Sequence, residues 1–296
     1  MPELAEVETV VRGLRRIAGR RIVGVWLAKT DFIHNPERMK TLLPGGRIDE
    51  IRRYGKLILA ALDRNDREPE RFWLVIHLGM TGQLVLCDPA EPVLPHTHVR
   101  FSLDDGSELR YVDIRRFGHM RVAPPEELAA LIAPLGADPL EVAEPEFRAR
   151  LGGRRARVKA LLLDQRVLRG LGNIYADESL WHARLHPARL GSDLTPEELG
   201  RLWRAIRLVL REAILRRGTS IANYVDSRGR SGTYQKRLRV YRRLGCSCRR
   251  CGAMIERAIV AGRSSHFCPR CQPARVGGRS GRPGKARGRE NRNGRR

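Results

Sequence analysis

The most specific chemical pattern in the sequence is a pair of CxxC motifs toward its C-terminal end. Cys248 and Cys251 form the first motif, and Cys268 and Cys271 form the second after a gap of sixteen residues. Two such turns supply four thiolates that close a tetrahedron around a zinc ion, as in a zinc ribbon. Because cysteine fills all four positions, no position is left for a catalytic water, and we expect one structural Zn2+ ion.

The two remaining cysteines are interpreted differently. Cys246 lies just before the first CxxC motif and is expected to be an exposed thiol that does not bind the metal. Cys87 is expected to be a small hydrophobic residue in the core. Five of the six cysteines crowd near one end of the chain, which in a cytosolic protein is typical of metal binding and argues against disulfides.

A second candidate for chemistry is the N-terminal pair Pro2 and Glu3. Methionine before proline is commonly removed, and removal of Met1 would leave Pro2 with a free secondary amine. An α-amino group has a pKa of about 7.7–8.0, so part of it is an unprotonated nucleophile at neutral pH. Such an amine can attack a sugar C1′ and form an iminium (Schiff base), while Glu3 protonates the sugar ring oxygen. Taken alone, these residues favour a plainer interpretation, a capped helix with proline at its start.

The charge of the chain indicates a polyanionic partner. The 296 residues hold 57 Lys and Arg against 33 Asp and Glu, a formal net charge of +24, and nucleic acid is the usual partner of such a surplus. A basic membrane-surface protein is the alternative, but no long basic amphipathic helix with bulky aromatic residues is evident. The acidic start, MPELAEVETV, lacks the apolar region of a signal peptide. No apolar run approaches the roughly 20 residues that a membrane span needs, so we expect a cytoplasmic protein without a membrane partner.

Hydrophobic periods predict the elements that position these residues. Over 3–18 apolar residues recur at intervals of three and four, which predicts an amphipathic helix with acidic residues in its first turns. Short β-rich runs broken by turn residues follow over 20–120 and predict an antiparallel sandwich or barrel. A proline-rich stretch over 123–146 is expected to join two domains.

The second half of the chain has a helical period. Residues 147–217 read as helices, and the last of these is predicted to start at Thr195 and to stop at Gly218. A polar loop follows over 218–237. After the cysteine cluster, residues 274–296 are rich in Gly, Arg, Pro and Asn, and we expect a disordered basic tail that adds non-specific affinity for phosphates.

Several motifs resemble the formamidopyrimidine-DNA glycosylase family. They follow the family's order over residues 2–272 and comprise MPELAEVETVVRGL, RRYGKLI, HLGMTGQL, DIRRFG, GLGNIYADESL and the four-cysteine finger. The resemblance implies a bacterial base-excision repair enzyme, a monomer that reaches the nucleoid by binding damaged double-stranded DNA. Its implied activity is excision of oxidised purines such as 8-oxoguanine and formamidopyrimidines, followed by β- and δ-elimination at the abasic site.

The resemblance also implies an α+β multidomain fold with DNA in the cleft between its domains. An N-terminal antiparallel β-sandwich with a flanking helix would be followed by a helical helix-two-turn-helix domain and a zinc-ribbon finger. The expected boundaries are 1–125 for the catalytic sandwich, 126–237 for the helical domain, 238–273 for the finger and 274–296 for the tail.

By the same resemblance, four residues carry the reaction. Pro2 is the nucleophile that attacks C1′, and Glu3 is the adjacent acid. Lys56, in RRYGKLI, contacts phosphate and assists the acid–base steps. Arg263, in AGRSSHFC, binds phosphate beside the lesion and assists the final elimination. Arginine supplies 51 of the 57 basic residues, so a lysine kept at position 56 fits a specific role.

An enzyme that acts on a base must take the base out of the duplex, and the space left behind needs to be filled. The resemblance assigns this role to Met80, Arg115 and Phe117. Methionine and phenylalanine are apolar wedges, and arginine can hydrogen-bond the orphaned partner base. The alternative for Met80 and Phe117 is an ordinary place in the core.

Four more positions match DNA contacts of the family. Asn173 lies in GLGNIYADESL, the expected helix-two-turn-helix, where it can bind a phosphate from a helix start or simply cap the helix. His96, Arg154 and Lys159 match further contact positions, although His96 could equally be an exposed loop histidine.

The chain departs from the family pattern at two positions. Ala5 stands where the family usually has proline, and Arg242 stands where glycine is common. Neither change removes a catalytic group, but together they leave the lesion preference open. An endonuclease VIII-like enzyme for oxidised pyrimidines is therefore one alternative, against which Met80 and the Arg115–Phe117 pair favour the purine branch. A zinc-ribbon DNA-binding protein without catalysis is the other, against which the intact Pro2, Glu3 and Lys56 argue.

Overall fold

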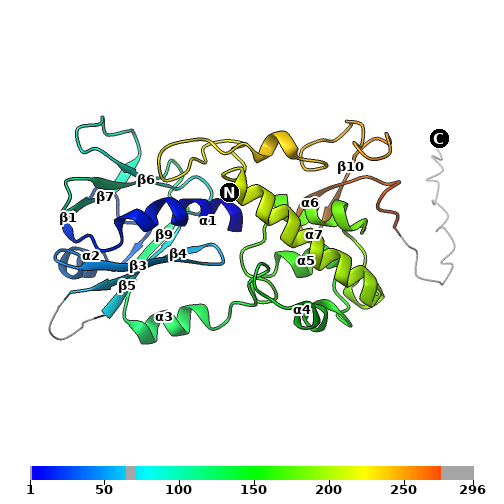
Figure 1. The fold of residues 1–296 in the computed structure, drawn as a ribbon, viewed down its shortest axis with the longest axis horizontal. Coiled ribbons are helices and arrows are strands. Elements are labelled where there is room, and N and C mark those ends of the chain that lie inside the picture. The colour runs from blue at the N-terminus through cyan, green and yellow to red at the C-terminus, as the bar shows by residue number, and fades with distance from the viewer. Residues whose placement is uncertain (1, 65–70, 275–296) are drawn as a thin grey trace, which may run out of the picture.

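The computed structural model describes residues 2–64 and 71–274, which fold into two lobes side by side (Figure 1). Strands gather in one lobe and helices with the cysteine hairpin in the other. The predicted disordered tail, 274–296, lies outside the described residues except for its first residue.

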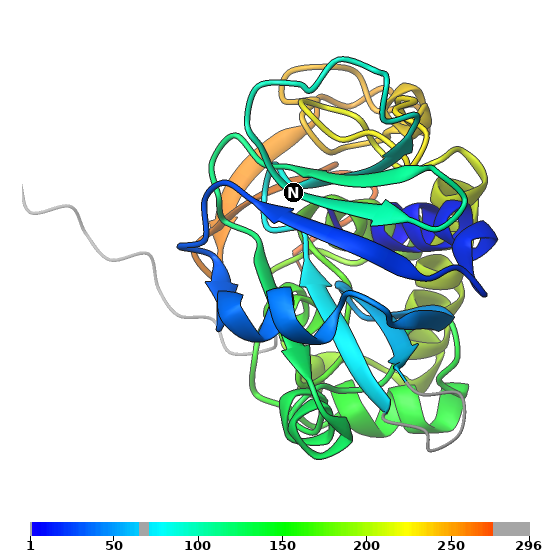
Figure 2. The same cartoon turned by 90° about the vertical axis from the view of Figure 1, so that its left-hand side faces the viewer.

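The strand lobe, which faces the viewer in Figure 2, is built from two packed sheets. One sheet has the order β1-β7-β8-β6, with β1 at Ile22–Leu27, β7 at Thr97–Leu103, β8 at Glu108–Val112 and β6 at Gln83–Cys87. The other has the order β2-β9-β5-β4-β3, with β2 at Ile33–His34, β9 at His119–Ala123, β5 at Arg71–His77, β4 at Leu57–Asp63 and β3 at Arg47–Tyr54. The predicted sandwich is confirmed. Its pairs are antiparallel apart from the short β2–β9 pair, which is parallel because a loop, not a hairpin, delivers β2 to the sheet edge.

Helix α1 (Leu4–Leu14) belongs to both lobes. Its residues Val7, Val11 and Leu14 pack between the two sheets in the sandwich core. Leu4 and Ala5, one turn earlier, are buried in the core of the helical lobe. The helix ends at Leu14, where a 3-10 turn over Arg15–Ile17 replaces the last turn of the helix predicted for 3–18.

The helical lobe packs four helices around a second core. These are α4 (Glu144–Leu151), α5 (Val158–Leu163), α6 (Asn173–Ala183) and α7 (Pro196–Leu215). As predicted, α7 starts at Thr195, whose side chain accepts a hydrogen bond from the Glu198 backbone N–H at 3.2 Å. The shorter helices α2 (Pro36–Leu42) and α3 (Pro125–Ile132) pack on the sandwich, α3 through Leu128. The exact domain boundaries stay a prediction.

The cysteine-rich segment forms a hairpin of β10 (Glu256–Val260) and β11 (Arg263–Phe267) between the two CxxC turns. It packs on the helical lobe through Trp181 of α6, over whose ring the Arg250 guanidinium lies at 3.9 Å. Cys246 is exposed, as predicted. Cys87 was expected in the core, and this prediction is wrong. The residue is the last of β6 and is only half-buried.

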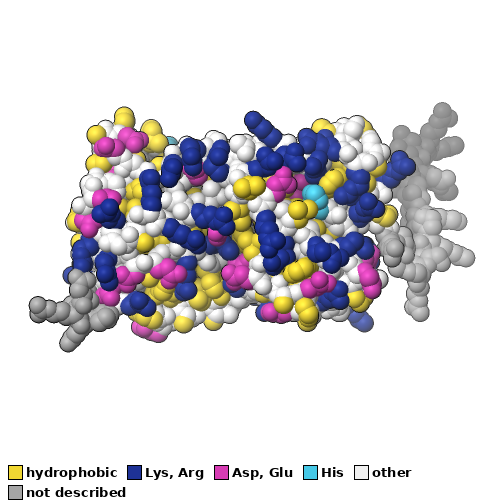
Figure 3. Space-filling model, in the orientation of Figure 1, with side chains coloured by type: hydrophobic (Ala, Val, Ile, Leu, Met, Phe, Trp, Pro, Cys, Tyr) yellow, Lys and Arg dark blue, Asp and Glu magenta, His cyan; other side chains and the backbone are white. Residues whose placement is uncertain are grey.

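Basic side chains are spread over the face of the molecule shown in Figure 3, across both lobes and the hairpin. Acidic side chains form smaller groups among them. In the part of the chain that the structure describes, no helix is both long enough and apolar enough to span a membrane.

Candidate active site and nucleic-acid interface

Glu3 lies where the two lobes meet, and its carboxylate occupies the N-terminal end of α6. The buried side chain accepts hydrogen bonds from the backbone N–H groups of Gly172 and Ile174, both at 2.9 Å, and of Tyr175 at 3.3 Å. These N–H groups have no partner within the helix, and the helix dipole favours a negative charge beside them. A Cβ atom on Gly172 would lie 2.4 Å from the carboxyl carbon of Glu3, so this approach requires glycine.

Pro2 precedes Glu3 at this junction and is buried. Lys56 reaches the same place from the turn between β3 and β4. Burial lowers the pKa of Lys56, while the charges of Glu3 and Glu6 oppose this shift and Arg263 adds to it. Burial also raises the pKa of Glu3, against the opposing charge of Lys56 and the backbone hydrogen bonds. A raised pKa makes a carboxyl readier to carry a proton, and a lowered pKa makes an ammonium readier to yield one.

The fold therefore brings the four predicted catalytic residues into one neighbourhood. Pro2 and Glu3 are consecutive, and Lys56 interacts electrostatically with both Glu3 and Arg263. Arg263 is the exposed first residue of β11, so the hairpin supplies one wall of the junction. The amine, the acid and two cations come from three segments that are far apart in the sequence.

Glu6 is a further residue of this junction, and the sequence did not single it out as a site residue. Its buried carboxylate accepts hydrogen bonds from the backbone N–H of Glu3 at 2.9 Å and of Thr219 at 2.7 Å, and from the Tyr175 hydroxyl. Burial and the nearby Glu3 charge raise the pKa of Glu6 to about 7. In the sequence the helix dipole alone accounts for the acidic residues of α1, because periodicity cannot tell that both faces of this helix are covered.

Met80, Arg115 and Phe117 lie on two adjoining loops of the sandwich, 78–82 and 113–118. Met80 is 42% exposed and Phe117 is 49% exposed, so neither is a core residue. The Arg115 guanidinium stacks over the Phe117 ring with its central carbon 4.3 Å from the ring centre. Two apolar tips and one arginine thus project together from one edge of the lobe.

The four cysteines of the CxxC motifs fit a zinc ion. Their sulfur atoms all lie within 4.8 Å of one another. The Cys248 and Cys271 sulfurs are 3.9 Å apart, and those of Cys251 and Cys268 are 3.5 Å apart. Sulfurs at the corners of a tetrahedral zinc site are about 3.8 Å apart for Zn–S bonds of about 2.3 Å. The four sulfurs would hold a zinc ion that ties the two CxxC turns together, and they would leave no ligand position for a reacting water.

Lys159 does not have the exposed position that a DNA contact requires. Its side chain is fully buried, and its ammonium pairs with Asp177 at 2.6 Å and donates to the Ser264 carbonyl at 2.9 Å. Asn173 donates from its side-chain amide to the same carbonyl at 3.0 Å. The motif match missed this because Asp177, eighteen residues further on, meets Lys159 only once α5 and α6 are packed. In this structure Lys159 joins the hairpin to the helical lobe.

The two remaining predicted contact residues are exposed and lie apart from the catalytic junction in the chain. His96 precedes β7 with a φ of 65°. Arg154 lies in the loop between α4 and α5. Both side chains are accessible to a ligand, and their role stays a prediction.

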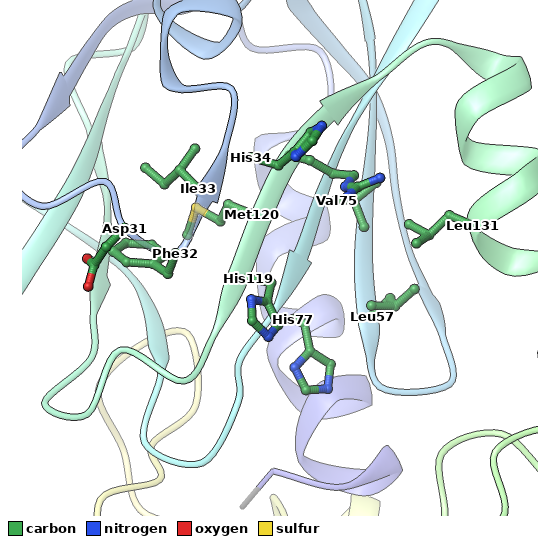
Figure 4. A pocket seen from close by; sticks show the side chains of 11 residues that line it. Asp31, Phe32, Ile33, His34, Leu57, Val75, His77, His119, Met120 and Leu131 are labelled. Atoms are coloured by element: carbon green, nitrogen blue, oxygen red, sulfur yellow. The ribbon is translucent and has the colours of Figure 1, made fainter.

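A groove of about 590 Å3 opens beside β9 and holds none of the predicted site residues. His77 and His119 lie side by side at one end of it (Figure 4), with ring centres 6.2 Å apart. Burial, Lys56 and His119 lower the pKa of His77 to about 4, so its imidazole is neutral at physiological pH. His77 directly precedes the loop that carries Met80, and its nearness to Lys56 appears only in the folded chain.

Comparison with known proteins agrees with this geometry. Three family models match consecutive parts of the chain: the formamidopyrimidine-DNA glycosylase N-terminal domain over residues 1–120, the helix-two-turn-helix domain of the same glycosylase over 135–225, and a zinc finger found in this glycosylase and in isoleucyl-tRNA synthetase over 248–274. The formamidopyrimidine-DNA glycosylase of Heliobacterium modesticaldum is 49% identical over 284 residues, which cover 92% of this chain and all of the relative.

The chain belongs to the formamidopyrimidine-DNA glycosylase family. The family's enzyme from Pelotomaculum thermopropionicum gives the same result, with 44% identity over 92% of this chain and 99% of the relative. The predicted family, DNA-repair glycosylase class and zinc finger are thereby confirmed.

Solved structures of this glycosylase family share the fold. A Lactococcus lactis enzyme in complex with DNA that contains a formamidopyrimidine lesion superposes with a TM-score of 0.84 at 34% identity, covering 92% of this chain and all of that chain. A complex of the Lactococcus lactis enzyme with abasic-site DNA gives the same TM-score. A third complex holds DNA with an oxidised pyrimidine and gives a TM-score of 0.83.

Proposed function

We propose that this family glycosylase excises oxidised purines, namely 8-oxoguanine and formamidopyrimidines, from duplex DNA and then cleaves the abasic site by β,δ-elimination. The observation that carries the proposal is the junction at which Pro2 and the buried Glu3 meet Lys56. An amine nucleophile beside a buried carboxyl whose pKa is raised, with a cation at hand, suits attack on a sugar C1′. The family membership and the lesion-DNA complexes of the Lactococcus lactis relative support the substrate class.

In the first step the Pro2 nitrogen, freed of Met1, forms a bond to C1′ of the damaged nucleotide. The bond from C1′ to the base breaks, and the base leaves with its electron pair and takes up the proton that the Pro2 nitrogen loses. Glu3, whose pKa is raised by burial, donates a proton to the sugar ring oxygen as the ring opens. The product is a positively charged iminium between Pro2 and C1′.

The iminium makes the C2′ proton acidic, and its loss expels the 3′ phosphate. Loss of a further sugar proton then expels the 5′ phosphate. A basic residue must receive these protons, and Lys56 suits this role because burial lowers its pKa. Arg263 is exposed beside Lys56 and suits the binding of a departing phosphate.

DNA binding follows from the exposed groups around the junction. Met80, Arg115 and Phe117 would fill the space left by the extruded base. Asn173, Arg154 and His96 stay proposed phosphate contacts. The net charge of +24 suits a cytoplasmic enzyme that reaches the nucleoid by binding DNA non-specifically.

A second substrate class has one specific observation in its favour. A Lactococcus lactis complex of this fold contains DNA with an oxidised pyrimidine. The rates at which the chain releases 8-oxoguanine and thymine glycol from the same duplex sequence separate the two classes, and we expect 8-oxoguanine to be released faster. Faster release of thymine glycol would contradict the purine assignment.

Borohydride trapping on 8-oxoguanine duplex tests the chemistry, because it reduces an iminium to a stable covalent adduct. We expect the wild-type chain to be trapped and Pro2→Gly to be trapped much more slowly. Initial rates must be compared, since a glycine amine retains some nucleophilicity. An equal trapping rate for Pro2→Gly, or no adduct with the wild type, would refute the mechanism.

A further inference from the structure

The loops 78–82 and 113–118, which carry Met80, Arg115 and Phe117, are called the void-filling loops below. Asp113 follows β8 at the base of these loops and is completely buried. One of its carboxylate oxygens accepts hydrogen bonds from the Thr81 hydroxyl and from the Arg115 backbone N–H at 3.2 Å. The other accepts from the Tyr111 hydroxyl at 2.9 Å and from the Gly118 backbone N–H at 3.0 Å. These four donors are neutral, so the carboxylate holds its surroundings by directed hydrogen bonds.

Asp113 also uses both of its backbone groups. Its N–H donates to the His96 carbonyl at 3.0 Å, and its own carbonyl is 3.0 Å from Nε2 of His98. Three separate segments therefore meet at one residue: the loop 78–82, the loop 113–118 and the stretch 96–98. Each segment carries proposed DNA-contact residues: Met80 in the first, Arg115 and Phe117 in the second, and His96 in the third.

The two void-filling loops are in direct backbone contact above this residue. A Cβ atom on Gly79 would lie 2.3 Å from the carbonyl carbon of Phe117, so the chains touch where Gly79 has a φ of +59°. Residues 114–117 are exposed, whereas the flanking Asp113 and Gly118 are buried. The exposed part of the loop is thus short and stands on a buried base.

We infer that Asp113 is a positioning residue that fixes the Met80 loop to the Arg115–Phe117 loop, so that the two enter the duplex as one unit. The inference rests on the proposed function. Wedge residues on two loops fill one gap between bases only if their spacing is held, because a displacement of about 1 Å can lower a reaction rate by about a hundredfold. Thr81 is the side chain that ties the Met80 loop to this carboxylate.

Thr81→Val tests the link, because it removes the hydroxyl and keeps the shape of the side chain. Thr81→Ser keeps the hydroxyl and is the matched control. We expect Thr81→Val to lower the single-turnover excision of 8-oxoguanine from duplex DNA by about tenfold, within the range for a small displacement. We expect Thr81→Ser to stay close to the wild type.

Cleavage of a preformed abasic site in single-stranded DNA separates positioning from folding, because no base needs to be extruded and no opposite strand is present. Both variants are expected to cleave this substrate at the wild-type rate. In a Met80→Ala background, Thr81→Val is expected to have little further effect on duplex excision, since the residue it positions is already gone.

The outcomes separate the inference from the function on which it rests. Unchanged duplex excision by Thr81→Val, an equal loss on both substrates, or effects that add fully to those of Met80→Ala would each overturn the positioning role. A wild-type chain that cleaves neither substrate would overturn the proposed function and the inference together.

Discussion

The catalytic junction buries charged side chains, whereas the void-filling loops expose apolar ones. At the junction the carboxylates of Glu3 and Glu6 are buried between the lobes and bonded to backbone N–H groups. At the loops Met80 and Phe117 expose apolar side chains above the buried Asp113. Both arrangements lie where chemistry or DNA contact is proposed.

The two regions also differ in what holds them. The junction draws on both lobes, since Glu3 begins a helix of the sandwich and caps a helix of the other lobe. The loops belong to the sandwich alone. They are tied together by the Asp113 carboxylate, by the hydrogen bond from the Arg115 N–H to the Thr81 hydroxyl and by the contact of Gly79 with Phe117. The junction should therefore depend on how the lobes pack, and the loops should not.

The largest expected effect is at the junction. Glu3→Gln removes the acid, and we expect the excision rate to fall by roughly a thousandfold, within the range for loss of a general acid. The amide also accepts fewer of the α6 hydrogen bonds, so some loss of stability should accompany it. Single-turnover excision of 8-oxoguanine measures the rate, and thermal unfolding measures the stability.

Glu178→Gln is the matched control for that change. Glu178 is likewise buried and accepts from three backbone N–H groups, those of Arg239 at 2.8 Å and of Val240 and Tyr241 at 2.9 Å. We expect a similar loss of stability without the loss of rate. Equal losses of rate for both variants would mean that Glu3 only holds the lobes together.

Zinc removal is expected to affect the junction and spare the loops. Chelation opens the finger, and β11 then no longer holds Arg263 or pairs with Lys159 and Asn173 through the Ser264 carbonyl. We expect excision to fall by roughly a hundredfold, as for a displaced catalytic group. Hydrogen exchange should quicken at β11 and the start of α6 and stay unchanged over 113–118. Faster exchange over 113–118 as well would contradict the claim that zinc removal affects only the junction.

Phe117→Ala is expected to have a smaller and purely functional effect. The side chain is about half exposed, so its loss should change the free energy of unfolding by no more than about 0.5 kcal/mol. Excision from duplex DNA should fall by about tenfold, because the wedge is gone. Cleavage of single-stranded abasic DNA is the control and should not change. A large drop in the melting temperature of Phe117→Ala would mean that Phe117 stabilises the core.

The last expected effect is on the pH dependence of stability and not on the reaction rate. The pKa of Glu6 rises from its ordinary value of 4.5 to about 7 on folding. The folded chain then binds more protons than the unfolded chain between these values, so stability falls as the pH rises through this window, by at most about 1.4 kcal/mol per pH unit. Glu6→Gln should flatten this slope in unfolding measured from pH 5 to 8. An unchanged slope would mean that Glu6 titrates normally.

The sequence predicted the parts of this molecule that depend on local pattern. Alternating apolar residues located most strands of the sandwich, and the Thr195 cap located the start of α7. The CxxC spacing identified the zinc site because each motif forms its own turn. Strand β3 (Arg47–Tyr54) carries charged residues at five of its eight positions, so apolar alternation does not mark it.

The contacts made across long separations could not be predicted. The sequence predicted a DNA contact at Lys159, but in the folded chain its ammonium is buried in an ion pair with Asp177. Glu6 and Asp113 look like ordinary acids in the sequence, because Glu6 accepts from the Thr219 N–H more than two hundred residues away and Asp113 accepts from the Thr81 hydroxyl in another loop. Each depends on packing that no local pattern encodes.

The central claim is that Pro2 is the nucleophile, and the trapped adduct tests it most directly. The wild-type chain would be reduced with borohydride on 8-oxoguanine duplex, digested with trypsin, and the DNA-linked peptide identified by mass. We predict the adduct on peptide 2–12, with Met1 absent and the link on the Pro2 nitrogen. An adduct on the peptide that contains Lys56, or on any other lysine, would contradict this account.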